Sequence, residues 1–284
     1  MSSTTWVTRN GRATTVTKYV ILTVVAIPWT LLPLWMLVVN SFKTESDAAV
    51  PSIALPETWN IVENYTTVFT DGDYLIGLRN SLMVSVPTVL AVLLLGSMAA
   101  WSFARSRSRS LRFFYYVMAL SIILPPAIVP TVVLLTRTGL TSTVAGYILA
   151  LVGTRLGVMV FLATGYIRTL PIDYEEAAQI DGASRWQVYR HVIVPLMAPI
   201  LFTVAVMTVI NVWNDFFFAL YMLKGAGNAT LPLTLYNFAN SSQYGVRRNL
   251  VFAHVLMTSL PLLVAYIVLQ RKVLSGLTDG GVTG

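Results

Sequence analysis

Long apolar runs alternate with short polar segments along the whole chain. A helix needs about 20 mostly apolar residues to cross the hydrocarbon of a bilayer, where only helices and closed barrels satisfy their backbone groups. Six runs meet this length, and we expect each to be a transmembrane helix. They lie near residues 19–41, 80–103, 113–135, 144–166, 194–222 and 249–269. The pattern therefore predicts an all-α membrane protein, a polytopic bundle of six transmembrane helices.

Several prolines fall inside these runs. A proline breaks a helix in water, but it is tolerated in a membrane when neighbouring helices or water bind the freed carbonyl oxygens. We therefore expect kinked, packed helices. The prolines are Pro28, Pro33, Pro87, Pro125, Pro126 and Pro130.

The composition supports a membrane protein. Of the 284 residues, 56% are apolar and 11% are charged, whereas about a quarter of the residues in a soluble domain are charged. The net charge of +7 comes from basic residues in scattered short groups, which form no continuous stripe for nucleic acid. The chain has no cysteine, and His191 and His254 lie far apart. The sequence therefore predicts no disulfide, no thiolate chemistry and no metal centre.

The basic residues set the expected orientation, because loops rich in Lys and Arg stay in the cytoplasm. If Lys18 is cytoplasmic, alternating spans place the Arg105–Arg112 and Arg168–Arg190 groups and Arg271 on the same side. Both termini then face the cytoplasm. We read the first run as an uncleaved span, since it is too long for a signal peptide. The predicted organisation is a cytoplasmic segment at 1–18, one six-span domain at 19–270 and a cytoplasmic tail at 271–284.

The loop at 168–193 carries the most distinctive pattern. Pro171 and the acidic residues after it suit the first turn of a short helix. Gly182 can end that helix in a left-handed conformation, and Ser184 with Gln187 forms a capping-box pattern that starts a second helix. We expect an elbow of two short helices, suited to docking against another surface. A structured loop without a partner is the alternative.

The same loop resembles the EAA motif of membrane subunits in bacterial ABC importers, through Glu176-Ala177-Ala178, Asp181-Gly182 and Pro195. The resemblance covers nearly the whole chain. The chain is most similar to carbohydrate permeases of the maltose-transporter class, specifically to their six-span partner subunit. The other matching segments are Glu63-Asn64-Tyr65, Asn80-Ser81-Leu82, Trp213-Asn214-Asp215-Phe216, Leu231-Pro232-Leu233, Gly276-Leu277-Thr278 and Gly280-Gly281-Val282.

This resemblance implies a type I importer permease of the bacterial cytoplasmic membrane that moves a carbohydrate by alternating access. It implies a second homologous permease, two copies of an ATP-binding subunit, an external substrate-binding protein and membrane lipid as partners, and no nucleic acid. It also implies that the elbow docks in a cleft of the ATPase, and that the tail from Thr278 to Gly284 reaches toward the same interface. The implied coupling residues are Glu176, Ala177, Ala178, Asp181 and Gly182.

The chain contains no GxxxxGK[ST] sequence, so it lacks the loop that cradles nucleotide phosphates. We therefore expect ATP and Mg²⁺ to be bound by the ATPase subunit. The chain itself is predicted to be non-enzymatic and to hold no cofactor.

Polar residues inside the spans suggest a substrate path. A charge at the bilayer centre costs about 2.5–3.5 kcal/mol on insertion scales, so Arg155 and Asp215 need partners. One hypothesis pairs them with each other, beside a path lined by Asn211 and Asn214. The alternative places Asp215 near the outer end of its span and pairs Arg155 with backbone carbonyls.

Other functions stay open from the sequence. Within the importer class, the cargo could instead be a glycerophosphodiester, an amino acid or a peptide. Outside it, a secondary transporter would show intramembrane carboxylate pairs or broken-helix repeats, and neither is evident in the sequence. A receptor or assembly protein that uses the elbow only for docking is the third class.

Overall fold

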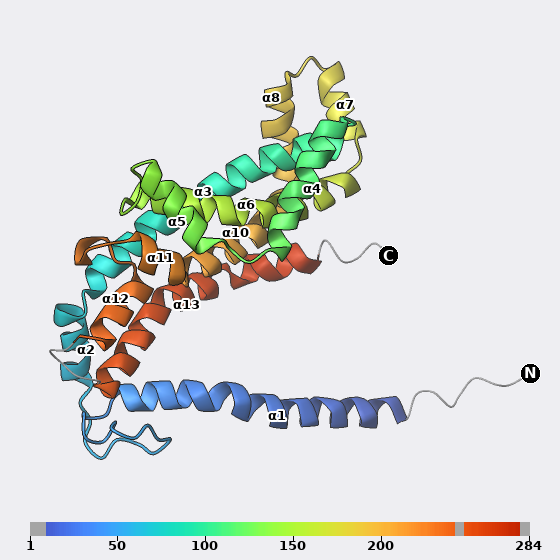
Figure 1. Ribbon diagram of the computed structural model, residues 1–284. Coiled ribbons are helices and arrows are strands. Elements are labelled where there is room, and N and C mark those ends of the chain that lie inside the picture. Colours follow the sequence, from blue (N-terminus) through green and yellow to red (C-terminus); the bar gives the residue numbers. More distant parts are fainter. Residues whose placement is uncertain (1–9, 242–246, 279–284) are drawn as a thin grey trace, which may run out of the picture. The chain divides into compact units, whose positions relative to one another are not determined.

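The computed structural model describes residues 10–241 and 247–278, in which all the regular elements are helices (Figure 1). The all-α prediction is therefore confirmed. The helices form two compact units. The first combines the chain up to Gly72 with Asn237–Met257, and the second combines Asp73–Tyr236 with the chain from Thr258 onward.

The first unit contains α1 (Asn10–Ser41), α2 (Ile61–Asp71) and the start of α13 (Arg248–Thr278). A buried asparagine, Asn64, organises it by donating hydrogen bonds to the carbonyl oxygens of Ser41 and Lys43, at 2.9 and 2.8 Å. The hydroxyls of Tyr65 and Ser41 also lie 3.0 Å apart. These contacts give a structural role to the Glu63-Asn64-Tyr65 segment, because they fix the chain that leaves α1 against α2.

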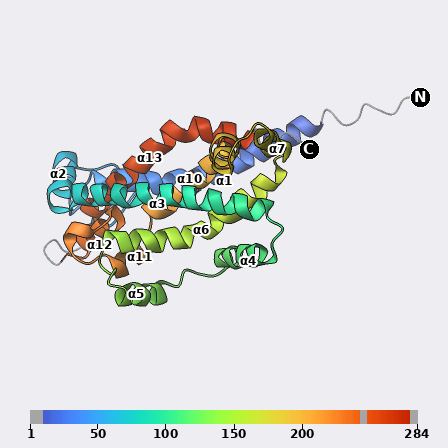
Figure 2. The ribbon, with the colours of Figure 1, turned by 90° about the horizontal axis from the view of Figure 1, so that it is seen from above.

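The second unit is built on α3 (Tyr74–Arg105), α6 (Val144–Thr169) and α10 (Ala198–Trp213), which pack against one another. Figure 2 shows α3 and α6 side by side, with α4 (Arg109–Ile123) on the other side of α6. Gly96 permits the close approach of α3 to α6, because a Cβ atom there would collide with the side chain of Met159.

The loop after α11 (Phe217–Met222) is tied to the start of α3 by two residues. Asn80 donates hydrogen bonds to the carbonyl oxygens of Gly227 and Ala229, at 2.8 and 3.0 Å. The Ser81 hydroxyl accepts a hydrogen bond of 2.9 Å from the Leu231 amide, which begins α12 (Leu231–Ala239). The Asn80-Ser81 and Leu231-Pro232-Leu233 segments of the sequence thus meet in space and close this loop, which includes a 3₁₀ turn at Ala226–Asn228.

Within the described residues, three helices are long and apolar enough to cross a membrane: α3, α6 and the Arg248–Ile267 part of α13. The number rises to five if two sharply bent helix pairs each count as one span. The first predicted span lies in α1, where several side chains are outside the described set. The count of six therefore stays a prediction.

The run at 113–135 is not the single helix that its hydropathy predicts. It forms α4 and α5 (Ile128–Arg137), bent by 119°. The cause is Pro125-Pro126, because a residue before proline avoids the helical region, and Leu124 is extended with ψ 134°. The break falls at two of the prolines where we expected a kink, and it divides the predicted helix into two.

The predicted fifth span at 194–222 is also divided. A bend of 74° separates Arg185–Leu196 from α10, and α10 ends at Trp213. The chain then turns through Asn214 before α11 begins at Phe217. The polar residues Asn214 and Asp215 therefore lie in a helix break.

Candidate functional site

The elbow, Pro171–Ile193, has the shape that its sequence predicts. Its two arms are α7 (Asp173–Ile180) and α8 (Arg185–Val188), which continues as a π-helical turn, Tyr189–Ile193, and then α9 (Val194–Leu196). Gly182 sits between the arms with φ +83°, in the left-handed region that favours glycine. The capping box is present, since the Ser184 amide donates to Gln187 Oε1 at 2.7 Å and Ser184 Oγ accepts from the Gln187 amide at 3.4 Å. Both arms are therefore well-ordered helices.

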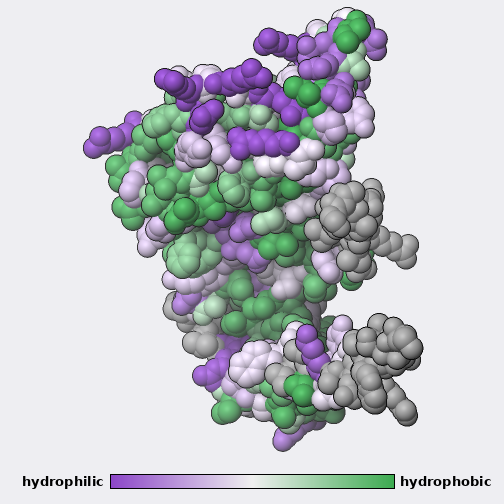
Figure 3. Space-filling view, turned by 90° about the vertical axis from the view of Figure 1, so that its right-hand side faces the viewer, coloured by the Kyte–Doolittle hydropathy of each residue, from purple (hydrophilic) through white to green (hydrophobic). Residues whose placement is uncertain are grey.

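The tip of the elbow is exposed and partly apolar. The implied coupling residues Glu176, Ala177, Asp181 and Gly182 are exposed, and Ala178 is half-buried. Ile180, on the same arm, leaves 85% of its surface exposed. Figure 1 shows α7 and α8 projecting beyond the ends of α3 and α4, and Figure 3 shows many hydrophilic side chains at this end of the second unit. Ile172, Tyr174 and Trp186 are also exposed on the elbow, and a group of exposed apolar side chains among polar ones is typical of a protein-binding surface.

The sequence reasoning missed the residue that anchors the elbow. Glu175, next to the exposed Glu176, is buried with 4% exposure. Its Oε1 accepts a 2.7 Å bond from Arg105 Nε in an ion pair, and its Oε2 accepts a 2.9 Å bond from Trp101 Nε1. Two adjacent carboxylates on a short helix point in different directions, and Arg105 was already predicted on the same side of the membrane. This pairing could have been proposed from those two signals.

One face of α10 is left open by the second unit. Met207, Ile210, Asn211 and Asn214 are all exposed, at helical spacings that place them on one stripe. The two asparagines donate their Nδ2 hydrogens to carbonyl oxygens one turn earlier, those of Met207 and Ile210, at 2.7 and 2.8 Å. Their side-chain oxygens are therefore left to accept hydrogen bonds from outside the chain. The opposite face of α10 is buried at Val204, Thr208 and Val212.

Asp215 has a partner, but it is not Arg155. Its Oδ2 accepts hydrogen bonds from the Tyr147 hydroxyl at 2.8 Å and from the Ala219 amide at 3.2 Å. Asp215 thus caps the start of α11, where a carboxylate is favoured by the helix dipole. Ion pairs among the described side chains join Lys43 to Asp47, Arg105 to Glu175 and Arg247 to Glu45. No ion pair within 4 Å joins Arg155 to Asp215 among the described side chains, and Arg155 acts on Asp215 as a nearby positive charge.

Arg155 is half-buried on α6, and its Nε has no hydrogen-bond partner within the described part of the chain. The alternative that Arg155 binds backbone carbonyls is not supported at this atom. Across the described ranges, no group of three or more His, Cys, Asp and Glu side chains is placed to hold a metal ion.

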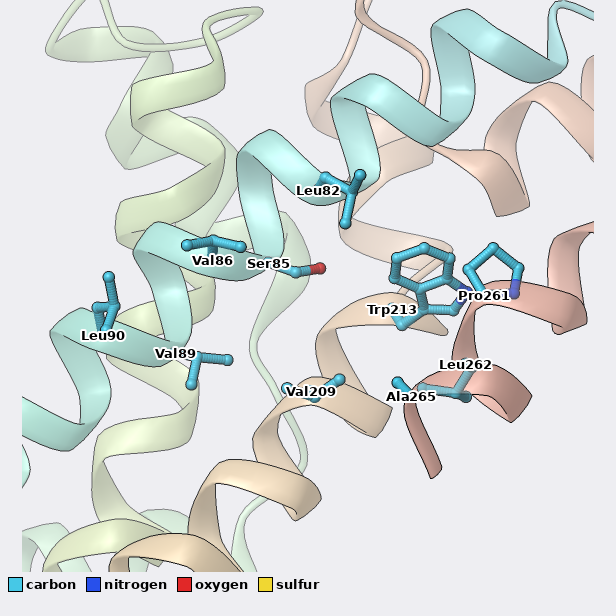
Figure 4. Close-up of a pocket in the computed structure, with 10 residues that line it drawn as sticks. All are labelled: Leu82, Ser85, Val86, Val89, Leu90, Val209, Trp213, Pro261, Leu262 and Ala265. Atoms are coloured by element: carbon cyan, nitrogen blue, oxygen red, sulfur yellow. The ribbon is translucent and has the colours of Figure 1, made fainter. Parts of the chain in front are cut away.

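A cavity of about 260 Å³ lies between α3, α10 and α13 (Figure 4). Its walls are apolar except at Ser85, whose buried hydroxyl has no partner among the described residues. Trp213 forms part of the wall, and its indole nitrogen donates a 3.2 Å hydrogen bond to the carbonyl oxygen of Thr258. Pro261 also lines the cavity and lies inside α13, where its missing N–H removes one helical hydrogen bond.

Comparison with protein families gives one match. The model of the family described as "binding-protein-dependent transport system inner membrane component" matches residues 92–272. This range includes the elbow, the π-helical turn and the whole of α10.

Relatives with sugar-related names match over most of their length. The diacetylchitobiose uptake system permease protein NgcG of Streptomyces coelicolor is 32% identical, over 88% of this chain and 83% of the relative. The probable starch degradation products transport system permease protein AmyC of Thermoanaerobacterium thermosulfurigenes is 31% identical, over 88% and 90%. Among solved structures, a bacterial ABC transporter involved in import of the acidic polysaccharide alginate has a similar fold, with a TM-score of 0.79, 21% identity and coverage of 94% and 99%.

Proposed function

Because the chain belongs to the family of binding-protein-dependent transport system inner membrane components, we propose that it is the permease subunit of an ABC importer that carries a carbohydrate across the bacterial cytoplasmic membrane. The observation that carries this proposal is the exposed, capped elbow on a chain that has no nucleotide-binding loop of its own. The names of its relatives, which refer to diacetylchitobiose and starch products, support a carbohydrate as cargo.

In this proposal the elbow docks on a separate ATP-binding subunit, which holds ATP and Mg²⁺. Glu176 offers an exposed carboxylate to a basic residue of that subunit. Ala177, with its small side chain, allows close approach, and Ile180 fills an apolar pocket. Asp181 and Gly182 form the turn that keeps this surface protruding. The permease chain itself has no catalytic role, and two ATPase copies serve two permeases.

The exposed stripe of α10 faces a second, homologous permease and the path of the solute. Asparagine side chains are unfavourable against hydrocarbon, so this stripe requires protein or water beside it. Asn211 and Asn214 have side-chain oxygens ready to accept hydrogen bonds, and sugar hydroxyls are suitable donors. Arg155, with its unpaired Nε, and Asp215, at the helix break, lie along the same path in this proposal.

The proposed orientation puts both termini in the cytoplasm, on the side of the elbow. Exposed arginines such as Arg107, Arg109 and Arg112 follow the end of α3, and clustered arginines favour the cytoplasmic side. An external binding protein delivers the solute at the opposite side. The proposed motion is alternating access, driven by closure of the ATPase.

The first experiment is to purify the tagged chain in mild detergent, identify what co-purifies, and measure ATP-driven sugar uptake after reconstitution. Recovery of an ATPase and a second permease, with uptake of one sugar class, would support the proposal. Recovery of the chain alone, with uptake driven by an ion gradient, would overturn it.

The docking surface can be tested with Ile180→Ser. We expect this variant to bind the ATPase at least about tenfold more weakly, because burying one aliphatic side chain at an interface contributes about 1.5–3 kcal/mol. Val62→Ser is the matched control, since Val62 is a similar side chain with 77% exposure in α2, which belongs to the first unit. Equal ATPase recovery from both variants would show that Ile180 is not at the interface.

A further inference from the structure

A single face at the end of α3 holds both arms of the elbow. Ser97, Trp101 and Arg105 lie four residues apart on the last turns of α3, so their side chains share one face. Arg105 and Trp101 bind Glu175 in the first arm. Ser97 and Trp101 contact Tyr189 in the second arm, with a distance of 2.7 Å between the two hydroxyl oxygens and 5.8 Å between the stacked ring centroids.

Glu175 in the first arm is held by Arg105 and Trp101 of α3, and we call the contact of these three residues the clamp. Both carboxylate oxygens of Glu175 are bound, one by a cation and one by an indole N–H. Arg105 also donates from Nη2 to the carbonyl oxygen of Leu170, at 3.1 Å. Leu170 belongs to the short extended link between α6 and α7. One arginine therefore braces both this link and the helix that follows it.

Without this clamp, the first arm would be held by the extended link to α6 and by its packing on α8 and the π-helical turn. Such a link has soft backbone torsions and would bend when the arm is pushed. The ion pair of 2.7 Å between Arg105 and Glu175 resists that bending, because separating the two side chains would leave the buried Glu175 carboxylate without its counter-charge. A displacement of the elbow is then transmitted to α3.

The other half of α3 lines a cavity, so a displacement of α3 would move the wall of that cavity. Residues Leu82 to Leu90 of α3 form one wall of the cavity that α10 and α13 complete. Between the cavity and the clamp, α3 packs closely on α6 at Gly96. One continuous helix thus joins the elbow at one end to the cavity at the other.

From this geometry we propose that Glu175 is a positioning residue, which with Arg105 and Trp101 locks the elbow to α3 so that movement of the ATPase-docking surface moves the wall that α3 contributes to the cavity between α3, α10 and α13. The inference rests on the proposed transport function. It assigns to Glu175 a role distinct from that of Glu176, which faces outward.

The test uses the full importer in proteoliposomes and measures the sugar molecules imported per ATP hydrolysed. Glu175→Gln should leave ATPase recovery close to wild type, and it should lower the temperature of thermal unfolding, because Arg105 loses its counter-charge. It should lower the transport ratio at least about tenfold, the effect expected when a buried charge-assisted contact is lost. Asp173→Asn is the matched control, because it removes one exposed carboxylate from the same helix, and its ratio should not change.

A double-mutant cycle separates a clamp from independent effects. Arg105→Gln should lower the ratio as Glu175→Gln does, and the double variant should be no worse than the more severe single variant. If Glu175→Gln fails to assemble, Trp101→Phe replaces it, since it removes one hydrogen bond and keeps an aromatic ring on Tyr189.

The chain has no cysteine, so a covalent clamp can be built. A short thiol cross-linker between Arg105→Cys and Glu175→Cys should restore the transport ratio that the unlinked double variant loses. A wild-type ratio in Glu175→Gln, strictly additive losses, or no recovery on cross-linking would overturn the clamp while leaving the importer function intact. Absence of ATP-driven uptake in the wild-type complex would instead overturn the proposed function.

Discussion

At the scale of single residues, adjacent or chemically identical side chains have different roles in this chain. Glu175 is buried in an ion pair, whereas Glu176 faces outward. Asn80 is buried and binds two carbonyl oxygens, whereas Asn211 is exposed and binds one. Residue type indicates which bonds a side chain can make, and burial decides whether those bonds serve the fold or a partner.

The contrast between the two asparagines gives a matched pair of predictions. Asn80→Ala should destabilise the protein by about 1–3 kcal/mol, because it leaves two carbonyl oxygens without their donor. Asn211→Ala should leave stability within about 0.5 kcal/mol, as for most exposed positions, and should lower sugar uptake. Thermal unfolding in detergent and uptake in vesicles measure the two effects. Equal destabilisation by both changes would contradict the assignment of Asn80 to the fold and Asn211 to the path.

At the scale of elements, backbone breaks define the important parts of the chain. Pro125-Pro126 divides the predicted third span, and the end of α10 at Trp213 divides the fifth. Gly182 forms the break that makes the elbow. No atom outside its own neighbourhood lies within 4 Å of a Cβ added at Gly182. Glycine is therefore needed here for its backbone conformation, since there is room for a side chain.

A prediction at Gly182 follows from its positive φ. Gly182→Val should uncouple ATP hydrolysis from transport, because a β-branched residue held in this conformation adds about 1–3 kcal/mol of strain and the turn would relax. Gly182→Asn is the control, since asparagine tolerates the left-handed region, and it should keep most of the coupling. Normal uptake by Gly182→Val in a fully assembled complex would contradict a required turn geometry.

At the scale of the whole molecule, two surfaces of the chain expose side chains that do not suit their surroundings. The α10 stripe leaves asparagines exposed within a predicted span, and the elbow exposes Ile180 to water. Each feature is unfavourable in the medium that surrounds it. A second permease and an ATPase would cover both surfaces.

The stripe can be tested by photo-cross-linking in the intact complex. A photoreactive residue in place of Ile210 should form a product with the second permease, because Ile210 is exposed on the open face. A probe in place of Val209, which lines the cavity on the adjacent side of α10, should not. Gel electrophoresis and mass spectrometry identify the products. Cross-linking of Ile210 to lipid alone would show that this face does not meet another protein.

The local features of this protein follow from its sequence. The helical class, the two arms of the elbow, the left-handed Gly182 and the Ser184–Gln187 capping box depend on interactions between neighbours along the chain. Hydropathy, capping and turn chemistry therefore predict them. The family resemblance also follows from the sequence, because its motifs are contiguous runs of residues.

The tertiary structure decided what depends on distant contacts. Glu175 meets Arg105 across 70 residues of sequence, and Asp215 meets Tyr147 across 68. Charge complementarity suggested Arg155 as the partner of Asp215, but several donors could satisfy one carboxylate. Hydropathy measures how apolar a run is and is insensitive to where its backbone turns, so it predicted continuous spans at 113–135 and 194–222 that the structure breaks. Tertiary packing therefore decides which side chains pair with each other and where the backbone turns.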